Sequence, residues 1–386
     1  MAVAPHSLQR LVDRFDPSAF DAPRGSARLA LEVPGEGAWE LQVDATGARL
    51  GLADGGARAD AVLRADGATW SRLADELTSG LEAYRSGRLV VRHDLHLGVG
   101  FLIATSGAEG PGRPRFRRIE TRSGSWSLAS AGQGEPVLLL HGLGATKGSF
   151  LPTIAGLAPS FEVIAVDLPG FGDSWKPLDA PYHPPFFAAA LVELLDALGI
   201  ERAHLVGNSM GGRIAIEMGL RHPARVGRLG LLAPSLAWRR TRPLAPLIRM
   251  LDPRLGFVQV APRPVVERIV HWIIPEAAPG WVRAGVDEFL RVYLTPRGRV
   301  ALYAAARQIY LEEPHGTKGF WTRLPRLAAP ALFIWGVHDR LVPLGFATHV
   351  RATLPSARHL ELDCGHVPQI ERPADTNTAL REFLES

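Results

Sequence analysis

The sequence predicts a protein of two domains, a small α+β domain followed by a larger α/β domain built on a mostly parallel sheet. A Gly- and Pro-rich stretch without periodicity, at 106–115, separates the two parts. Upstream of it, short segments alternate apolar and polar residues with the period of half-buried strands. Downstream, short and wholly apolar runs alternate with helical segments, which is typical of parallel strands connected by helices.

The composition is that of an ordinary globular chain. The 386 residues are 46% hydrophobic and 21% charged, and the length suggests two or three domains. The single cysteine, Cys364, excludes an internal disulfide framework. A net charge of +4 without a basic run interleaved with aromatic residues does not favour nucleic acid as a partner. No apolar stretch has the length of a signal peptide or a membrane span, so we expect a soluble, cytoplasmic protein without stable membrane insertion.

The first domain, residues 1–105, is predicted to be α+β. Helical spacing occurs at 8–15 and again at 68–77, where Gly80 follows. Four segments have strand character: 27–33, 39–44, 48–52 and 61–64. The domain contains neither a serine in a glycine-flanked turn nor a His/Cys cluster, so we expect no catalytic group from it.

The segments Ala59–Arg64, Trp70–Leu73, Gly87–Val91 and Leu95–Leu102 give this first domain a family resemblance. It resembles the SCP2-type sterol-carrier fold over about residues 10–105, which implies a five-stranded sheet and helices around an apolar tunnel for lipid or acyl chains. That family often has a glycine after the strand near position 92, where this chain has Arg92-His93. Two roles remain open: a lipid-binding module, or a structural module for packing or for a homodimer.

The second domain, residues 119–386, follows a linker at 106–118. Its predicted strands are 136–140, 161–166, 203–206, 226–232, 331–335 and 358–362. Its predicted helices are 185–198, 210–220 and 346–354. From 238 to 324 no buried strand is apparent, and the segment is helical in pattern, Pro-punctuated and net positive. An insertion of this size predicts a helical cap at about 236–325.

The motif Gly207-Asn-Ser209-Met-Gly211 identifies the candidate nucleophile. It fits G-x-S-x-G between a predicted strand and a predicted helix, the context of a serine on a sharp turn with its Oγ exposed. Gly207 and Gly211 leave room where a Cβ would collide with neighbouring backbone. The N-terminus of the following helix favours developing negative charge.

The loop after the strand at 136–140 is the candidate oxyanion site. It reads His141-Gly142-Leu143-Gly144, and we expect the backbone N–H of Leu143 to bind an oxyanion together with that of Met210. A plain glycine-rich turn is the alternative interpretation. The neighbouring Ser209 motif favours the oxyanion site.

A serine nucleophile needs a base and an orienting carboxylate. His366 follows the strand at 358–362, and Asp339 follows the strand at 331–335, which gives the chain order Ser, Asp, His. Two competitors remain, namely His338 beside Asp339 and Asp363 near His366. We expect Asp339 and His366 because open α/β sheets place their sites at the C-terminal ends of strands.

Five motifs in order give the second domain its resemblance: His141–Gly144, Asp167–Ser174, Gly207–Gly212, Trp335–Asp339 and Cys364–His366. It resembles the α/β-hydrolase family over residues 119–386, which implies an eight-stranded sheet and a helical cap after the sixth strand. The Gly-Asn-Ser-Met-Gly-Gly form is similar to that of meta-cleavage-product C–C hydrolases. Those enzymes usually carry Trp after the Gly-His pair, where this chain has Val367, and we expect Asn208 and Val367 to line the substrate pocket. Epoxide hydrolases and haloalkane dehalogenases use Asp as nucleophile, so Ser209 argues against both.

These residues together predict a serine hydrolase, an esterase or lipase-like enzyme acting on an ester or thioester of a small apolar or lipid-like substrate. One alternative is a C–C bond hydrolase of the meta-cleavage-product type. The other is a lipid-binding or scaffold protein with a relict hydrolase fold. Cys364 is interpreted as a packing residue. No cofactor or metal is expected, because the sequence has no P-loop, no dinucleotide-binding glycine loop and no metal-ligand cluster.

Overall fold

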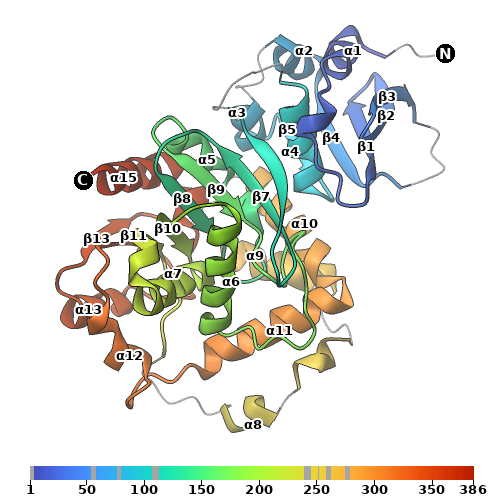
Figure 1. Cartoon of the computed structure of the whole chain (residues 1–386). Coiled ribbons are helices and arrows are strands. Elements are labelled where there is room, and N and C mark those ends of the chain that lie inside the picture. The colour runs from blue at the N-terminus through green and yellow to red at the C-terminus, as the bar shows by residue number, and fades with distance from the viewer. Residues whose placement is uncertain are drawn as a thin grey trace. The chain divides into compact units, whose positions relative to one another are not determined.

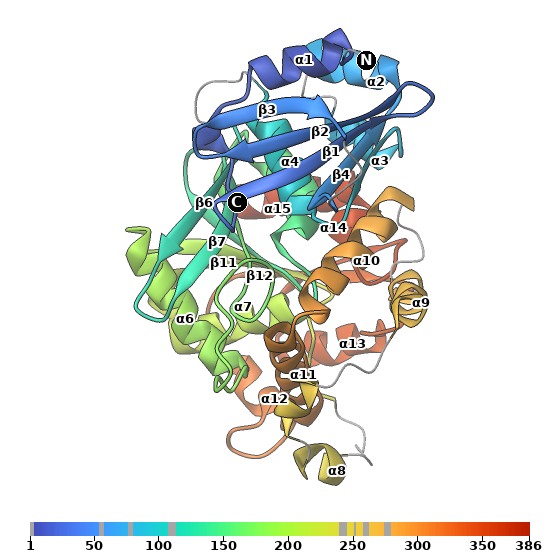
Figure 2. The same ribbon diagram turned by 90° about the vertical axis from the view of Figure 1, so that its right-hand side faces the viewer.

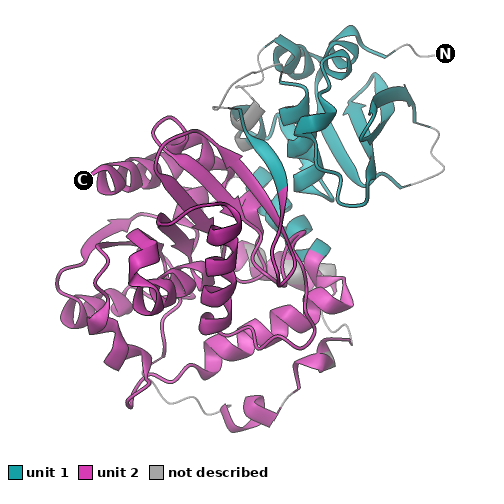
Figure 3. Ribbon diagram, viewed as in Figure 1, with its two compact units in different colours: residues 1–117, 277–291 teal, residues 118–276, 292–386 magenta. Residues whose placement is uncertain are grey.

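The computed structural model describes residues 4–53, 58–75, 80–106, 113–238, 245–250, 252–257, 262–273 and 279–386. The chain forms two compact units, and each of them is built from two chain segments (Figure 3). Unit 1 comprises Met1–Arg117 and Ala277–Arg291, and unit 2 comprises Arg118–Glu276 and Val292–Ser386.

Unit 1 is built on a five-stranded sheet with the order β3-β2-β1-β4-β5 (Figure 1). Its strands are β1 (Ser26–Val33), β2 (Gly37–Asp44), β3 (Gly47–Leu52), β4 (Ala61–Ala65) and β5 (Leu89–Arg92). Its helices before the boundary are α1 (His6–Asp13), α2 (Gly67–Asp75), α3 (Gly80–Arg85) and α4 (Leu95–Ala104). The central strand β1 pairs antiparallel with β2 and parallel with β4. The number of strands is the one implied by the sterol-carrier resemblance, which itself stays a prediction.

The alternating pattern of β1 and β2 builds the core of unit 1. Leu29, Leu31 and Leu41 are fully buried, and the residues next to each of them in the strands are partly exposed or exposed. Trp70 of α2 is also fully buried, and its indole N–H donates to the carbonyl of Glu32 at 3.1 Å. The helix is thus held on the sheet by packing and by a satisfied polar group.

Helix α10 (Pro279–Tyr293) departs from the predicted organisation. The sequence placed all of 236–325 in the cap of the second domain, whereas residues 277–291 belong to unit 1. The physical reason is that the part of the helix in unit 1 buries the apolar side chains of Trp281, Val282, Ala284, Val286 and Leu290. It also makes hydrogen bonds to residues of the N-terminal segment.

Unit 2 contains an eight-stranded sheet with the order β13-β12-β11-β10-β8-β9-β7-β6. Its strands are β6 (Arg115–Glu120), β7 (Ser125–Ala131), β8 (Pro136–Leu140), β9 (Glu162–Val166), β10 (Ala203–Asn208), β11 (Val226–Leu232), β12 (Ala331–Gly336) and β13 (Arg358–Leu362). The strands β8 to β13 are mutually parallel, and β7 runs antiparallel to β9. The predicted mostly parallel, eight-stranded sheet is confirmed. Strand β6 begins inside the predicted linker 106–118, because its polar sequence hides its strand character.

Helices cover the sheet of unit 2. They are α5 (Leu151–Leu157), α6 (Pro184–Ala197), α7 (Met210–Arg221), α13 (Gly345–Thr353), α14 (Pro368–Glu371) and α15 (Pro373–Glu385). Helix α6 contacts α7, and α5 contacts α15 (Figure 1). After β11 the chain forms α8 (Ala245–Met250), α9 (Arg263–Ile273), α11 (Pro296–Leu311) and α12 (Phe320–Arg323), and α8 contacts α11 (Figure 2). Among the described residues, no helix combines the length and the apolar character that a membrane crossing requires.

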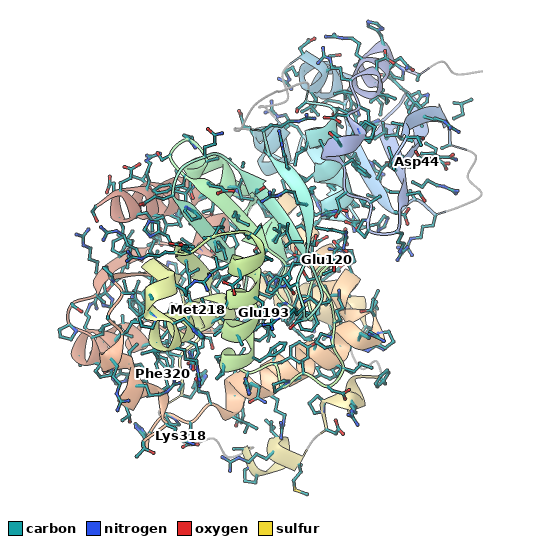
Figure 4. All side chains as sticks on the ribbon, in the orientation of Figure 1. Asp44, Glu120, Glu193, Met218, Lys318 and Phe320 are labelled. Atoms are coloured by element: carbon teal, nitrogen blue, oxygen red, sulfur yellow. The ribbon has the colours of Figure 1, made fainter. Side chains whose placement is uncertain are left out.

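A buried ionic cluster ties the end of α11 to α7. Arg213 of α7 is 2% exposed, and its guanidinium donates to Glu217 and to Glu312, each at 2.8 Å. The same guanidinium lies 4.9 Å from the ring centre of Phe320, which Figure 4 labels together with Met218 of α7. The helix that follows the candidate nucleophile is therefore joined to the segment that leaves α11.

Candidate active site

Ser209 occupies a strained turn between β10 and α7. Its backbone has φ 53° and ψ −114°, a conformation that costs free energy for a residue with a Cβ. A Cβ at Gly207 would collide with the backbone of Gly211, and a Cβ at Gly211 would collide with the carbonyl of Leu140. The two glycines of the motif are therefore required by close backbone contacts on both sides of the serine.

His366 and Asp339 are in direct contact. The Nδ1 atom of His366 lies 2.7 Å from Oδ2 of Asp339, and both side chains are buried. The other carboxylate oxygen of Asp339 accepts the backbone N–H groups of Leu341 and Val342, at 2.8 and 2.9 Å. A carboxylate that accepts all three bonds places the proton on Nδ1 of His366, which leaves the Nε2 lone pair to act as a base.

The competing residues form a different pair. His338 Nε2 lies 2.8 Å from Asp363 Oδ1, and these side chains are 58% and 76% exposed. Asp363 therefore directs its carboxylate to His338 at the surface, while Asp339 binds His366 in the interior. The geometry favours Asp339 over Asp363 as the partner of His366.

Asn208 joins the loop of Ser209 to the loop of His366. Its side-chain Nδ2 donates to the carbonyls of Leu232 and His366, at 3.1 Å in each case. The residue is 4% exposed. The sequence suggested Asn208 for the substrate pocket together with Val367, but both N–H groups of its amide are bonded to backbone. Val367 is partly buried.

Glu371 of α14 holds the backbone on both sides of His366. Its two carboxylate oxygens accept the N–H groups of Gly365 and Val367, at 3.0 and 2.9 Å. The side chain is nearly buried, with the residue 6% exposed. The sequence analysis missed this residue. The sequence feature that could have revealed Glu371 is an acidic residue in a helical turn just after the Gly-His pair. A carboxylate at this position can accept backbone N–H groups of the preceding loop.

His141 orients the candidate oxyanion loop. Its Nε2 accepts the N–H of Leu168 at 3.0 Å, so the proton lies on Nδ1, which donates to the carbonyl of Gly142 at 2.8 Å. Burial lowers the pKa of His141, which keeps the ring neutral. In a trans peptide the N–H points opposite to the preceding C=O, so the N–H of Leu143 is directed away from His141. A Cβ at Gly142 would lie 3.4 Å from Cβ of Ser209, so this loop passes beside the serine.

The N–H of Met210, the second predicted oxyanion donor, belongs to the first residue of α7. The first N–H groups of a helix have no acceptor within the helix and are therefore available to an anion. Leu143 and Met210 thus flank Ser209 from the β8 loop and from its own turn. That these two N–H groups bind an oxyanion stays a prediction.

A buried ion pair fixes the loop beyond Gly144. Lys147 Nζ lies 2.6 Å from Asp167 Oδ2, and the backbone N–H of Lys147 donates to the other oxygen at 2.8 Å. Asp173 contributes its N–H to the same carboxylate at 2.9 Å. Burial alone would raise the pKa of Asp167, but the charge of Lys147, together with the nearby His141 and the hydrogen bond from the N–H of Asp173, outweighs burial and lowers the pKa. The loops after β8 and β9 are thereby locked together.

Cys364 lies two residues before His366 and is fully buried. Burial, reinforced by the nearby Glu371 carboxylate, raises the pKa of its thiol to about 12. A thiol in this environment is a poor nucleophile. The arrangement agrees with the interpretation of Cys364 as a packing residue.

Within the described ranges, no three His, Cys, Asp or Glu side chains are grouped so that they could hold a metal ion.

Comparison with known proteins places this geometry in a family. Residues 135–272 match the family described as alpha/beta hydrolase fold. The chain is 30% identical over 273 residues to 2-hydroxymuconate semialdehyde hydrolase of Pseudomonas putida, covering 67% of this chain and 90% of that protein. The chain belongs to the α/β-hydrolase fold family.

Solved structures of other hydrolases agree with this membership. The 2-hydroxy-6-oxo-6-phenylhexa-2,4-dienoate hydrolase of Rhodococcus sp. strain RHA1 is 28% identical, with a TM-score of 0.58, and the match covers 71% of this α/β-hydrolase and 99% of that chain. A membrane phospholipase A, described as a bacterial virulence factor, is 26% identical, also with a TM-score of 0.58. That match covers 83% of this chain and 93% of the phospholipase chain.

Proposed function

We propose that this α/β-hydrolase is a serine hydrolase that cleaves an ester or thioester of an apolar, lipid-like substrate through an acyl-enzyme on Ser209. The observation that carries the proposal is the buried hydrogen bond between His366 and Asp339. Asp339 and His366 follow β12 and β13, at the C-terminal ends of parallel strands in the same sheet as β10, which leads into the strained turn of Ser209.

Each residue has one task in the proposed reaction. Ser209 Oγ attacks the acyl carbonyl while His366 Nε2 takes its proton, and Asp339 stabilises the imidazolium that forms. The N–H groups of Leu143 and Met210 bind the oxyanion of the tetrahedral intermediate. The intermediate collapses as His366 returns the proton to the leaving oxygen or sulfur. A water molecule, deprotonated by His366, then releases the acid and restores Ser209.

Two observations support an apolar substrate. The chain between β11 and β12 is long enough to cover a substrate with helices, and the described part of it includes α9 and α11. The match to the membrane phospholipase A covers 83% of the chain, which is more than unit 2 alone provides, because unit 2 holds 254 of the 386 residues. The resemblance of the N-terminal domain to sterol carriers favours the same substrates through lipid binding, whereas a purely structural role of that domain leaves the choice of substrate to unit 2.

C–C bond hydrolysis of a dienoic diketone is the second candidate. The observation that favours it is the identity of about one third with hydrolases of this type, including the 2-hydroxymuconate semialdehyde hydrolase. The motif Gly207–Gly212 has their form. Val367 argues against it, because those enzymes usually carry Trp at this place.

The deciding experiment compares three readouts on the purified full chain. These are labelling of Ser209 by a fluorophosphonate, hydrolysis of p-nitrophenyl esters from short to long acyl chains, and cleavage of a meta-cleavage dienoic diketone. Labelling with ester hydrolysis that improves with acyl length supports the first proposal. Labelling with efficient diketone cleavage and poor esterase activity supports the second. A folded protein that is not labelled and turns over neither substrate contradicts both and favours a lipid-binding or scaffold role.

A further inference from the structure

Helix α10 is an integral part of unit 1, although it lies about 160 residues beyond the N-terminal segment in sequence. The ring of Tyr84 meets the ring of Trp281 edge to face, with 4.8 Å between their centres. The Tyr84 hydroxyl donates to the carbonyl of Gly280 at 3.4 Å. Burial raises the pKa of Tyr84, so the hydroxyl keeps the proton that it donates.

The carboxylate of Asp287 on α10 accepts several hydrogen bonds from the N-terminal segment of unit 1. It accepts Nε of Arg92 at 2.6 Å, Nη2 of Arg92 at 3.3 Å and the backbone N–H of His93 at 3.1 Å. The Asp287 side chain is only 4% exposed. A two-pronged guanidinium–carboxylate pair at such a site fixes orientation, and removal of the guanidinium takes the ionic partner away from a buried carboxylate.

Two carboxylates from α10 complete the turn between β5 and α4. His93 has a φ of 72°, in the left-handed region that disfavours a residue with a side chain, and Asp287 holds its N–H. Glu288 accepts the N–H of Leu95 at 2.9 Å, at the N-terminus of α4, where a negative charge is favoured. The adjacent acidic residues of α10 therefore bind two N–H groups, those of His93 and Leu95, in one turn of the N-terminal domain.

The chain on both sides of α10 is anchored to the candidate active site within unit 2. Before α10, the carbonyl of Ile273 at the end of α9 accepts the backbone N–H of His366 at 3.4 Å. After α10, the chain continues directly into α11, and Glu312 at the end of α11 binds Arg213 of α7. In the sequence, α10 therefore lies between α9, which contacts the His366 loop, and α11, whose C-terminal end contacts the helix after Ser209.

We propose that the N-terminal domain acts as the anchor of α10 and that Arg92 is a positioning residue for substrate binding. By holding Asp287, Arg92 fixes α10, and α10 constrains the flanking segments, which contact the loop of His366 and the helix after Ser209. The domain therefore influences how long acyl substrates bind, without supplying a catalytic residue. This inference rests on the proposed ester hydrolysis for its kinetic consequence, but not for the anchoring itself.

Hydrogen exchange tests the anchoring independently of activity. In the full chain, Arg92→Ala should accelerate amide exchange in residues 282–290 by at least about tenfold, because the buried Asp287 loses the two-pronged bond from the guanidinium. Arg64→Ala is the matched control, since Arg64 lies in the same domain and pairs with Glu32 at 2.6 Å in a largely exposed setting. Unchanged exchange in 282–290 in Arg92→Ala, or equal acceleration in Arg64→Ala, would overturn the inference.

Kinetics test the consequence for substrate. Arg92→Ala and Asp287→Asn should each raise KM for long-chain p-nitrophenyl esters by about 2- to 30-fold, the range of energetic coupling through a packed element, with kcat for the acetate ester within about twofold. Arg92→Lys should restore part of the effect. An equal loss on short and long esters contradicts a positioning role. Failure of a fluorophosphonate to label the wild-type chain contradicts the proposed function instead, and the exchange result then still decides whether α10 is anchored.

Discussion

The side-chain amide of Asn208 donates a hydrogen bond to the main-chain carbonyl of His366 at 3.1 Å. The residue that precedes the candidate nucleophile therefore sets the position of the loop that carries the candidate base. Asn208 ends β10 and also holds the carbonyl of Leu232, which ends β11, so one buried amide joins the ends of these two strands to the loop after β13. The relative placement of the serine and histidine loops is built into the fold before any substrate binds.

Replacement of the candidate nucleophile is the first test. Ser209→Ala should abolish fluorophosphonate labelling and reduce kcat for ester hydrolysis by a factor on the order of 10⁶, the loss seen when a serine protease loses its triad serine. Ser160→Ala, at an exposed serine of the same unit, should retain full activity. Activity of Ser209→Ala within about tenfold of wild type would show that another group is the nucleophile.

The two candidate acids can be separated by matched amides. Asp339→Asn should lower kcat by about 10⁴-fold, because the amide favours the wrong tautomer of His366. Asp363→Asn should change kcat less than about twofold, since its pair with His338 is exposed and contributes under about 1 kcal/mol. Steady-state kinetics with one ester measure both. A larger loss in Asp363→Asn would reverse the assignment.

Substitution of Glu371 tests whether this residue positions His366. Glu371→Gln preserves size but cannot accept the N–H groups of both Gly365 and Val367 through two carboxylate oxygens. A displacement of His366 on the order of 1 Å should cost about 10²-fold in kcat. Circular dichroism checks that the variant is folded. Glu382→Gln on α15, at an exposed glutamate, is the control, and an equal effect of both substitutions would remove the special role of Glu371.

The ionic cluster on α7 predicts a specific dependence of stability on pH. Burial would raise the pKa of Glu217, but Arg213, Arg323 and Arg221 outweigh it and lower the pKa from 4.5 to about 2. A lowered folded-state pKa means that the stabilisation is fully present above pH 4.5 and is lost as the pH falls towards 2. The shift corresponds to about 3 kcal/mol of unfolding free energy.

Urea unfolding of Glu217→Gln measures this contribution. The variant should be less stable than wild type by about 3 kcal/mol at pH 7, and the difference should shrink between pH 4.5 and pH 2. Glu361→Gln, which breaks the exposed pair with Arg351, should cost under about 1 kcal/mol. A difference that does not vary with pH would mean that Glu217 acts through packing alone.

Cys364 should be chemically silent in the folded protein. Because burial raises the pKa of its thiol to about 12, alkylation by iodoacetamide at pH 8 should be negligible without denaturant and complete in it. Mass spectrometry of the intact chain measures the modification. Rapid alkylation with parallel loss of activity would place a reactive thiol in the active site.

The sequence predicts best the elements whose own residues carry the signal. The ends of β8 and β11 are those expected, because buried parallel strands are continuous apolar runs bounded by loops. Strand β6 has a polar sequence without a period, and its partners in the sheet decide its conformation. The placement of α10 depends on the pair of Arg92 and Asp287, which lie 195 residues apart.

The same distinction holds within the site. The strained serine turn and the Asp–His pair can be inferred because glycines and chain order mark them. The carboxylate of Glu371 and the amide of Asn208 bind backbone groups of other loops, and such contacts leave no periodic pattern in the sequence. Only the folded arrangement shows that they hold the histidine loop.

Unit 1 is built from two chain segments that lie far apart in the sequence, and this affects when it can fold during synthesis. Its first segment ends at Arg117, but its last helix begins only near Ala277, about 160 residues later. At about 5–20 residues per second, the ribosome needs roughly 8–30 s to make that intervening stretch. During this time the nascent N-terminal segment lacks Trp281 and the two carboxylates that complete its turn after β5. Residues buried beneath α10, Tyr84 among them, are then open to chaperones, and the first domain matures only after much of the second has emerged.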